Sequence, residues 1–178
     1  MTDHNATNPA ALITDLATKG RAAQRALARM DSAAKAKALN AAADALDDDR
    51  QTILDANAKD IAAGEERGLA PAMLDRLKLD GDRLDGIVSA IRNVAQLDDP
   101  VGEVIASSKA PSGLDLSRVR IPIGLIGIIY ESRPNVTADA AALCVRSGNG
   151  AILRGGSEAV HSNRAINKAL AEGLAKGG

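Results

Sequence analysis

The chain has 178 residues, of which 46% are hydrophobic and 25% are charged, a composition typical of a soluble globular protein. Lys and Arg number 22 and Asp and Glu 23, and this net charge of -1 argues against nucleic acid or an anionic membrane as a partner. The single Cys excludes an internal disulfide, and two distant His residues, His4 and His161, predict no metal site. No apolar stretch reaches the roughly 18 to 20 residues of a membrane span, and the N-terminus does not resemble a signal peptide. We therefore expect a cytoplasmic protein.

The first 97 residues predict four helices. Asn8-Pro9 provides an N-cap and a first-turn proline, and Asp31 restarts the helical pattern after a break. The Ala-rich stretch 33–45 favours a closely packed helix. A third helix is expected to end at Gly68 and Pro71. The fourth helix shows the clearest apolar face, with residues repeating at three- and four-residue intervals: Leu84, Ile87, Val88, Ile91, Val94 and Ala95.

The composition changes at residue 100, where strand-like segments begin. Segments 101–109 and 114–120 flank an Ala-Pro-Ser-Gly turn and predict a β-hairpin. The apolar run 121–130 predicts a strand buried on both faces, as in a parallel sheet. A helix opening at Pro134, a short strand at 151–153 and a final helix follow. The fold class is therefore α/β: N-terminal helices, a hairpin and the first β-α-β-α of a doubly wound domain. Two strands do not complete such a sheet, so we expect the chain to be truncated.

The end of the first buried strand carries polar side chains suited to chemistry. Ligands of open α/β sheets bind beyond the carboxyl ends of the strands, where Glu131 to Asn135 lies. The Asn135 amide can donate to a developing oxyanion, and Arg133 can neutralise an anionic substrate or phosphate. Alternatively, Asn135 caps the helix that begins beside Pro134, and Arg133 is a solvated loop residue. The spacing leaves both interpretations open.

Arg154 directly follows the second predicted strand and precedes two glycines. Gly155 and Gly156 allow a ligand to approach the backbone closely, and free N–H groups at the start of a helix attract anions. Arg154 could contact a ribose phosphate. The alternative is a tight turn with Ser157 as the N-cap, and the sequence favours neither interpretation.

Three other groups are interpreted as structural. Cys144 lies within a predicted apolar helix and is expected to be a small buried hydrophobe rather than a nucleophile. His161 is expected at the surface. The run Asp47 to Asp49 is expected to be a solvated helix terminus rather than a site for a divalent ion.

Two stretches carry a family resemblance: IPIGLIGIIYESRPNVTADAAALCVRSGNGAILRGGSEAVHSN and, upstream, DRLKLDGDRLDGIVSAIRNVAQLDDPVG. They closely resemble the glutamate-5-semialdehyde dehydrogenases (γ-glutamyl phosphate reductases) of the aldehyde dehydrogenase superfamily. The resemblance covers essentially the whole chain and is most specific in YESRPNVT and LRGGSEA. It implies an aldehyde dehydrogenase-like fold, with residues 1–99 as the helical part of the cofactor domain. Residues 100–120 would form an oligomerisation hairpin, and residues 121–178 the start of the NADP-binding α/β domain.

The resemblance also implies a function. The family reduces L-glutamyl 5-phosphate with NADPH to L-glutamate 5-semialdehyde and phosphate, a step of proline biosynthesis. The family's nucleophilic Cys would lie beyond residue 178, so we expect this chain to be an N-terminal piece that is inactive alone. By resemblance, Asn135 belongs to the oxyanion hole, Ser132 and Arg133 contact the substrate, and Arg154 suits the 2′-phosphate of NADP. The other residues expected to contact the cofactor are Gly155, Gly156, Ser157 and Glu158.

Two further hypotheses remain. One is a short non-catalytic module that binds NADP or mediates oligomerisation through the hairpin, and the other is a helical scaffold without a ligand. A naturally short chain should carry a polar face where partner strands are missing, but residues 121–130 show none. The glycine-rich strand ends argue against the scaffold. The enzyme interpretation is therefore preferred.

Overall fold

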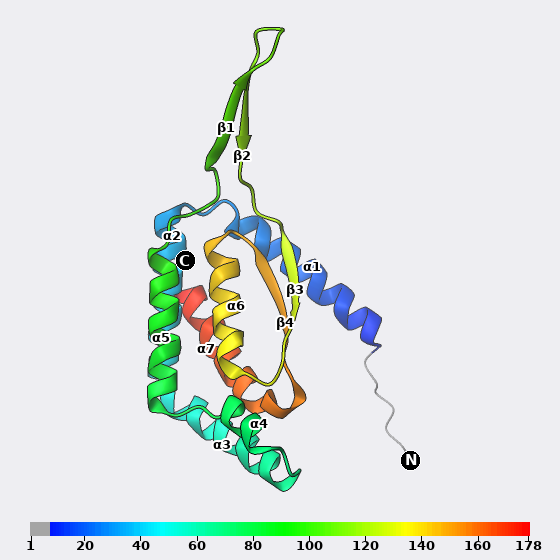
Figure 1. The fold of residues 1–178 in the computed structure, drawn as a ribbon, viewed down its shortest axis with the longest axis vertical. Helices are drawn as coiled ribbons and strands as arrows, with labels where there is room; N and C mark the ends of the chain where they lie inside the picture. The colour runs from blue at the N-terminus through cyan, green and yellow to red at the C-terminus, as the bar shows by residue number, and fades with distance from the viewer. Residues whose placement is uncertain (1–7) are drawn as a thin grey trace.

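The protein is described by a computed structural model that covers residues 8–178; His4 and the rest of the extreme N-terminus lie outside this range. Figure 1 shows α2, α5, α6 and α7 packed together, with β3 and β4 between α6 and α1. The helices are α1 (Pro9–Leu27), α2 (Ser32–Asp48), α3 (Arg50–Glu66), α4 (Pro71–Leu77), α5 (Gly81–Gln96), α6 (Pro134–Arg146) and α7 (Val160–Gly177). The strands are β1 (Val104–Lys109), β2 (Asp115–Val119), β3 (Leu125–Ile129) and β4 (Gly150–Arg154), and a 3-10 turn, Ser157–Ala159, precedes α7.

Side-chain caps begin the first two helices at the predicted positions. The Asn8 carboxamide oxygen accepts from the Ala10 N–H at 3.0 Å, and the Asp31 carboxylate accepts from the Ala34 N–H at 2.7 Å. One prediction needs correction, because Pro71 does not simply end the third helix but opens α4. A seven-residue helix completes barely two turns, too few for an apolar periodicity to show in the sequence.

One apolar core joins the N-terminal helices to the later ones. Its buried members come from α2, α3, α5 and α7, with two alanines from α6, and they include Leu39, Leu46, Ile53, Leu84, Ile91, Ala138, Ala142 and Ile166. The Ala-rich helix packs closely, as predicted. Gly173 of α7 lies so near α2 that an added Cβ would come within 2.4 Å of the Ala42 Cα.

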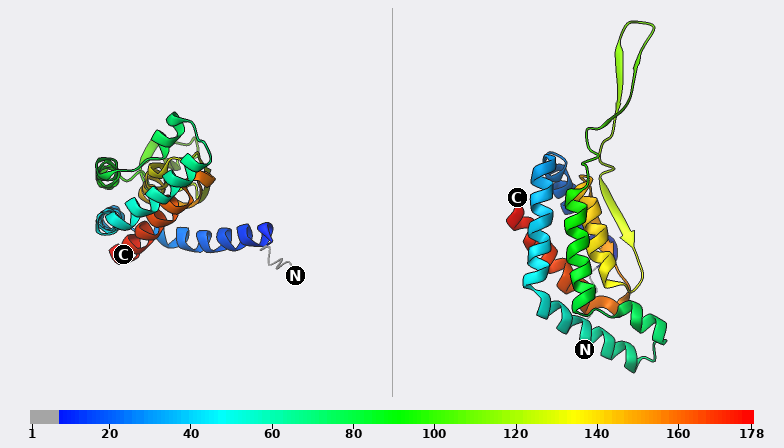
Figure 2. Two further views of the ribbon diagram at one scale, coloured as in Figure 1. Left: turned by 90° about the horizontal axis from the view of Figure 1, so that it is seen from below. Right: turned by 60° about the vertical axis from the view of Figure 1, so that its left-hand side comes forward.

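The predicted hairpin is confirmed and stands away from the helices (Figures 1 and 2). β1 and β2 pair antiparallel from Val104↔Val119 to Lys109↔Asp115, and every residue of both strands is exposed. Gly113 adopts a φ of 91° in the connecting turn, a conformation that favours glycine.

β3 and β4 pair in parallel, from Leu125↔Gly150 to Ile129↔Arg154, and α6 connects them as predicted. The expectation that the first strand is buried on both faces is wrong for this chain, because Ile129 is 81% exposed. β3 is also shorter than predicted, and Ile121 and Ile123 precede it in exposed backbone. The physical reason is that, in residues 8–178, the sheet has only two strands, so apolar side chains of β3 remain uncovered.

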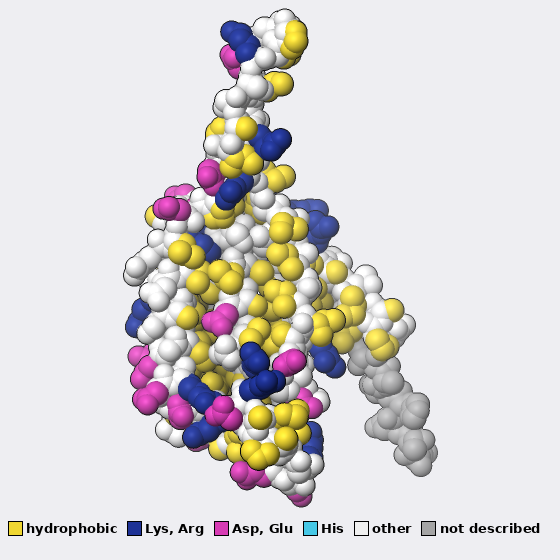
Figure 3. All heavy atoms as spheres, in the orientation of Figure 1, with side chains coloured by type: hydrophobic (Ala, Val, Ile, Leu, Met, Phe, Trp, Pro, Cys, Tyr) yellow, Lys and Arg dark blue, Asp and Glu magenta, His cyan; other side chains and the backbone are white. Residues whose placement is uncertain are grey.

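Apolar side chains therefore gather on one face of the molecule. Figure 3 shows them over β3 and along α1. The exposed members on α1 are Leu12, Ile13 and Leu16. None of the helices within residues 8–178 combines the length and apolar character needed to cross a membrane.

Candidate functional site

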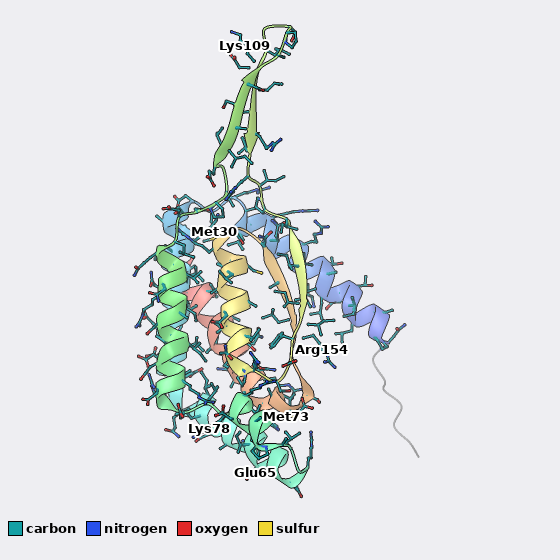
Figure 4. All side chains as sticks on the ribbon, in the orientation of Figure 1. Met30, Glu65, Met73, Lys78, Lys109 and Arg154 are labelled. Atoms are coloured by element: carbon teal, nitrogen blue, oxygen red, sulfur yellow. The ribbon has the colours of Figure 1, made fainter. Side chains whose placement is uncertain are left out.

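The carboxyl ends of β3 and β4 form the edge at which the sequence predicts ligand binding. The strands are parallel and in register, so both end at the same edge of the sheet. There the Tyr130 N–H donates a hydrogen bond to the Arg154 carbonyl at 3.1 Å. Figure 4 places Arg154 at this end, facing the α4 region that carries Met73. Here lies a strand-end groove of about 540 Å³, and five predicted site residues line it: Ser132, Arg133, Arg154, Gly156 and Glu158.

The two glycines at this edge are required by contacts within the chain. A Cβ on Gly156 would lie 2.1 Å from the Ser132 Oγ, and one on Gly155 would lie 2.2 Å from the Asn163 Nδ2. The ring of Tyr130 would also lie 3.0 Å from the Cβ on Gly155. The segments after β3 and β4 therefore pack directly on one another, and this packing demands glycine whether or not a ligand binds.

Glu158 connects the two strand ends. Its Oε2 accepts a hydrogen bond from the Ser132 hydroxyl, and its Oε1 accepts one from the Ser157 hydroxyl at 3.2 Å. The Ser132 hydrogen bond, followed by the backbone N–H of Glu158 itself, lowers the pKa of this carboxyl. Glu158 is thus an anionic acceptor in the groove. The N-cap alternative for Ser157 is wrong, because the 3-10 turn starts after Gly156 without a side-chain cap.

The first N–H groups of α7 are already bonded to an internal carboxylate. The buried Asp60 of α3 accepts from the N–H of His161 at 3.1 Å and from the N–H of Ser162 at 2.7 Å. The Ser162 hydroxyl also donates to Asp60, at 2.6 Å. The expectation that these N–H groups are free to attract a ligand anion is therefore wrong. No local sequence signal could reveal this cap, because Asp60 lies about a hundred residues earlier in the chain.

Asn135 lies in the first turn of α6 and does not cap it. Pro134 occupies the start of the helix, Arg133 is the N-cap without a side-chain bond, and the Asn135 Nδ2 donates to the Asp139 Oδ2 at 3.1 Å. The capping alternative is therefore wrong.

Asn135 lines a second cavity, the helical cleft, between α5 and α6, and Arg133 lines both this cleft and the strand-end groove. The Arg133 Nε lies 4.0 Å from the Glu131 carboxylate, and the Arg133 side chain is half-exposed.

A polar network behind the strand ends was missed by the sequence analysis. The Thr137 hydroxyl donates to the Asn163 Oδ1 at 2.9 Å and lies 2.6 Å from the Tyr130 hydroxyl, which is then the donor between them. These residues join the end of β3, α6 and α7. Isolated polar residues on helices give no sequence signal of such a network. It borders a lateral groove of about 750 Å³ between α1, β4 and α7, which Gly155 and Ser157 also line.

The three groups interpreted as structural behave as expected. Cys144 is buried, and burial raises the pKa of its thiol, the opposite of what a nucleophile needs. His161 is exposed, and Asp47 forms an ion pair with Arg50 at 2.6 Å. Within residues 8–178, no group of three or more His, Cys, Asp or Glu side chains is placed to hold a metal ion.

Solved structures identify the class of fold. An aldehyde dehydrogenase-like protein of Bacillus subtilis superimposes with a TM-score of 0.68 at 17% identity, covering 93% of this chain and 34% of that one. At this identity the likeness concerns the fold alone. The chain therefore has the fold of part of an aldehyde dehydrogenase, as the sequence predicts. No protein-family profile matches the chain.

More similar proteins carry one name, gamma-glutamyl phosphate reductase, and the chain is homologous to them. The protein of Novosphingobium aromaticivorans is 66% identical over 167 residues, which are 94% of this chain and 39% of the relative. That of Sphingopyxis alaskensis is 58% identical over 95% of this chain, again 39% of the relative. The chain thus spans about two fifths of the length of these curated relatives.

Solved structures of gamma-glutamyl phosphate reductases agree with this similarity. The reductase of Thermotoga maritima matches with a TM-score of 0.89 and 45% identity, covering 92% of this chain and 40% of that chain. The reductase of Saccharomyces cerevisiae matches with a TM-score of 0.86 and 36% identity, covering 91% and 41%. The resemblance inferred from YESRPNVT and LRGGSEA is confirmed.

Proposed function

We propose that the chain is part of an NADPH-dependent reductase that converts L-glutamyl 5-phosphate to L-glutamate 5-semialdehyde and phosphate, a cytoplasmic step of proline biosynthesis. The observation that supports this most is the 66% identity to a gamma-glutamyl phosphate reductase over 94% of the chain. The activity belongs to the full-length gene product, and its nucleophilic cysteine is expected outside these 178 residues. That thiolate would displace phosphate from the acyl phosphate, and the cofactor would supply the hydride that reduces the resulting thioester to the aldehyde and frees the thiolate.

The experiment that tests this function runs the reaction backwards with the purified full-length gene product. Glutamate 5-semialdehyde, phosphate and NADP⁺ are supplied, and the formation of NADPH is followed by its absorbance. Reduction of NADP⁺ that requires phosphate is expected. Reduction that proceeds equally without phosphate would contradict an acyl-phosphate enzyme.

Residues at the strand ends fit a nicotinamide cofactor, which the aldehyde dehydrogenase-like family implies. When bound, the cofactor supplies the hydride. We assign Arg154, which is exposed in the strand-end groove, to the 2′-phosphate of NADP. Glu158 is an anionic acceptor in the same groove and suits a ribose hydroxyl. Gly155, Gly156 and Ser157 complete the proposed contact segment.

Replacing Arg154 by Ala should discriminate between the two nicotinamide cofactors. Loss of the guanidinium removes a charge-assisted contact to the 2′-phosphate, so the KM for NADPH should rise at least about tenfold more than the KM for NADH. Steady-state kinetics with both cofactors measures this. Arg92→Ala is the control, because Arg92 lies on α5 and pairs with Asp44 at 2.8 Å. An equal loss for both cofactors would remove the proposed role.

Replacing Asn135 by Ala should slow the acyl step. The amide is proposed to donate to the oxygen that becomes negative in the transition state, and losing one such donor lowers kcat by about a hundredfold. The KM for NADPH should stay nearly constant. Asn93→Ala, on the exposed side of α5, is the matched control. An unchanged kcat would show that Asn135 is not part of the oxyanion hole.

The remaining assignments concern the small-molecule substrate and assembly. We assign Ser132 and Arg133, next to Asn135, to the phosphorylated end of the substrate, although the Ser132 hydroxyl donates to Glu158 in this structure.

Residues 100–120 are proposed to mediate homo-oligomerisation, which is supported by exposed apolar side chains on both strands, such as Val104 and Leu116. Residues 1–99 and 121–178 would then form the cofactor-binding part.

A further inference from the structure

The helical cleft contains open space beside Asn135. It has a volume of about 500 Å³ and is lined from α5 by Gly86 and Ala90 and from α6 by Asn135 and Asp139. A Cβ added to Gly86 would meet no atom within 4 Å. Small residues on α5 thus leave room opposite two polar side chains that lie one turn apart on α6.

Asp139 presents a carboxylate without a cation. In residues 8–178 its one side-chain hydrogen bond comes from the neutral Asn135 amide at 3.1 Å, and none of the ion pairs includes it. The other carboxylate of the cleft, Asp75, is already paired with Arg83 at 2.7 Å. A carboxylate accepts about four hydrogen bonds, so Asp139 has capacity for a cationic ligand group.

Basic side chains line the same cleft. Arg76 and Lys78 each lie 3.7 Å from their nearest carboxylates, Glu131 and Asp80, and more than half of each basic side chain is exposed. Such long, exposed ion pairs contribute little and exchange readily for a ligand. The cleft therefore offers the Asp139 carboxylate to an ammonium group and several basic side chains to a carboxylate. Together they complement the ammonium and carboxylate of an amino acid.

The spacing of the two α6 residues fits a glutamyl chain. Cβ atoms four residues apart on a helix are about 5–6 Å apart. In an extended glutamyl group, four bonds separate the reacting carbonyl carbon from the amino nitrogen, a span of about 5 Å. We propose that Asp139 binds the α-ammonium group of the substrate while Asn135 faces the reacting carbonyl, so that the helical cleft selects α-amino acyl substrates. This inference rests on the proposed function.

The test compares two aldehydes in the oxidation assay with the full-length gene product. Glutamate 5-semialdehyde carries the amino group, and 5-oxopentanoate has the same chain and carboxylate without it. Wild-type enzyme should prefer the first in kcat/KM. In Asp139→Asn this preference should fall at least about tenfold, through a higher KM for the amino substrate. The side-chain oxygen at position 139 still accepts the hydrogen bond from the Asn135 amide in this variant, so the orientation of Asn135 is retained. Asp82→Asn, in the exposed first turn of α5, is the matched control.

The other outcomes overturn the inference in different ways. An equal fall for both aldehydes would mean that Asp139 acts through Asn135 or through the fold rather than on the amino group. An unchanged preference would mean that the amino group binds elsewhere. If the wild-type enzyme oxidises neither aldehyde, the proposed function fails, and this inference fails with it.

Discussion

Replacing Lys35 by Met should destabilise the helical core by about 3–5 kcal/mol at pH 7, the typical cost of removing one partner of a buried ion pair. The Lys35 side chain is fully buried, and its Nζ lies 2.7 Å from the Asp99 Oδ2. Asp99 is also largely buried, and its Oδ1 accepts from the Val101 N–H at 3.0 Å. The variant keeps the hydrophobic stem but leaves this carboxylate without its cation. Hydrogen exchange of α2 amides in the folded full-length protein measures the loss.

The pH dependence of that loss separates charge from packing. Burial would raise the pKa of Asp99, but hydrogen bonds from Lys35 and from the Val101 N–H outweigh it and lower the pKa below its usual value. A group with a lowered folded-state pKa stabilises the protein fully above its unfolded pKa of about 3.9. This stabilisation is lost as the pH falls through the lower folded pKa. The deficit of Lys35→Met should therefore be largest at pH 7 and shrink towards pH 3.

A double variant provides the control. Asp99→Asn in the Lys35→Met background removes the unpaired charge and should recover a large part of the lost stability. A deficit that stayed constant with pH and was not recovered would mean that Lys35 matters only through the packing of its stem.

This ion pair belongs to a cluster that holds the base of the hairpin. Arg146, at the end of α6, donates from its Nε to the Leu97 carbonyl at 2.8 Å and from its Nη1 to the Ser32 carbonyl at 2.8 Å. The segment 97–101 is thus tied to α2 and α6 just before β1 begins. The cluster therefore fixes the direction in which the hairpin projects from the helices. The proposed assembly through the hairpin would depend on that direction.

The sequence predicted the elements whose signals are local. The apolar face around Leu84, the helix start at Asp31 and the turn before Leu114 each depend on residues only a few positions apart, and each is confirmed. The carboxyl ends of both strands were placed to within one residue, because an apolar run followed by Pro134 or Gly155 marks them without tertiary information.

The details of the candidate site depend on contacts that are distant in sequence. The Asp60 cap of α7 and the packing of Gly156 on Ser132 join segments that show no mutual pattern in the sequence. The exposure of Ile129 depends on which strands join the sheet, which the local apolar run does not report. The pair Asn135 and Asp139 is different, since its four-residue spacing on a predicted helix could have revealed it.

Close contact between α2 and α7 gives the second large expected effect. A Cβ on Gly173 would lie 2.4 Å from the Ala42 Cα and 2.6 Å from the Ala41 carbonyl oxygen. A Cβ on Gly177, one turn further along α7, would lie 2.4 Å from the Ala38 Cα. These neighbours are backbone atoms and cannot rotate away, so the helices would have to move apart along the core that contains Leu39 and Ile166.

The double variant Gly173→Ala/Gly177→Ala should therefore lose about 2–6 kcal/mol, counting roughly 1–3 kcal/mol for each overpacked site. Hydrogen exchange of α7 amides in the full-length protein measures it. Gly86→Ala is the matched control, because Gly86 is helical and exposed and has no atom within 4 Å of an added Cβ. There the same substitution should stabilise by about 1 kcal/mol, through helix propensity alone. If the double variant were stabilised, as Gly86→Ala is expected to be, helix propensity rather than the α2–α7 contact would determine the effect, and glycine would not be required for this helix packing.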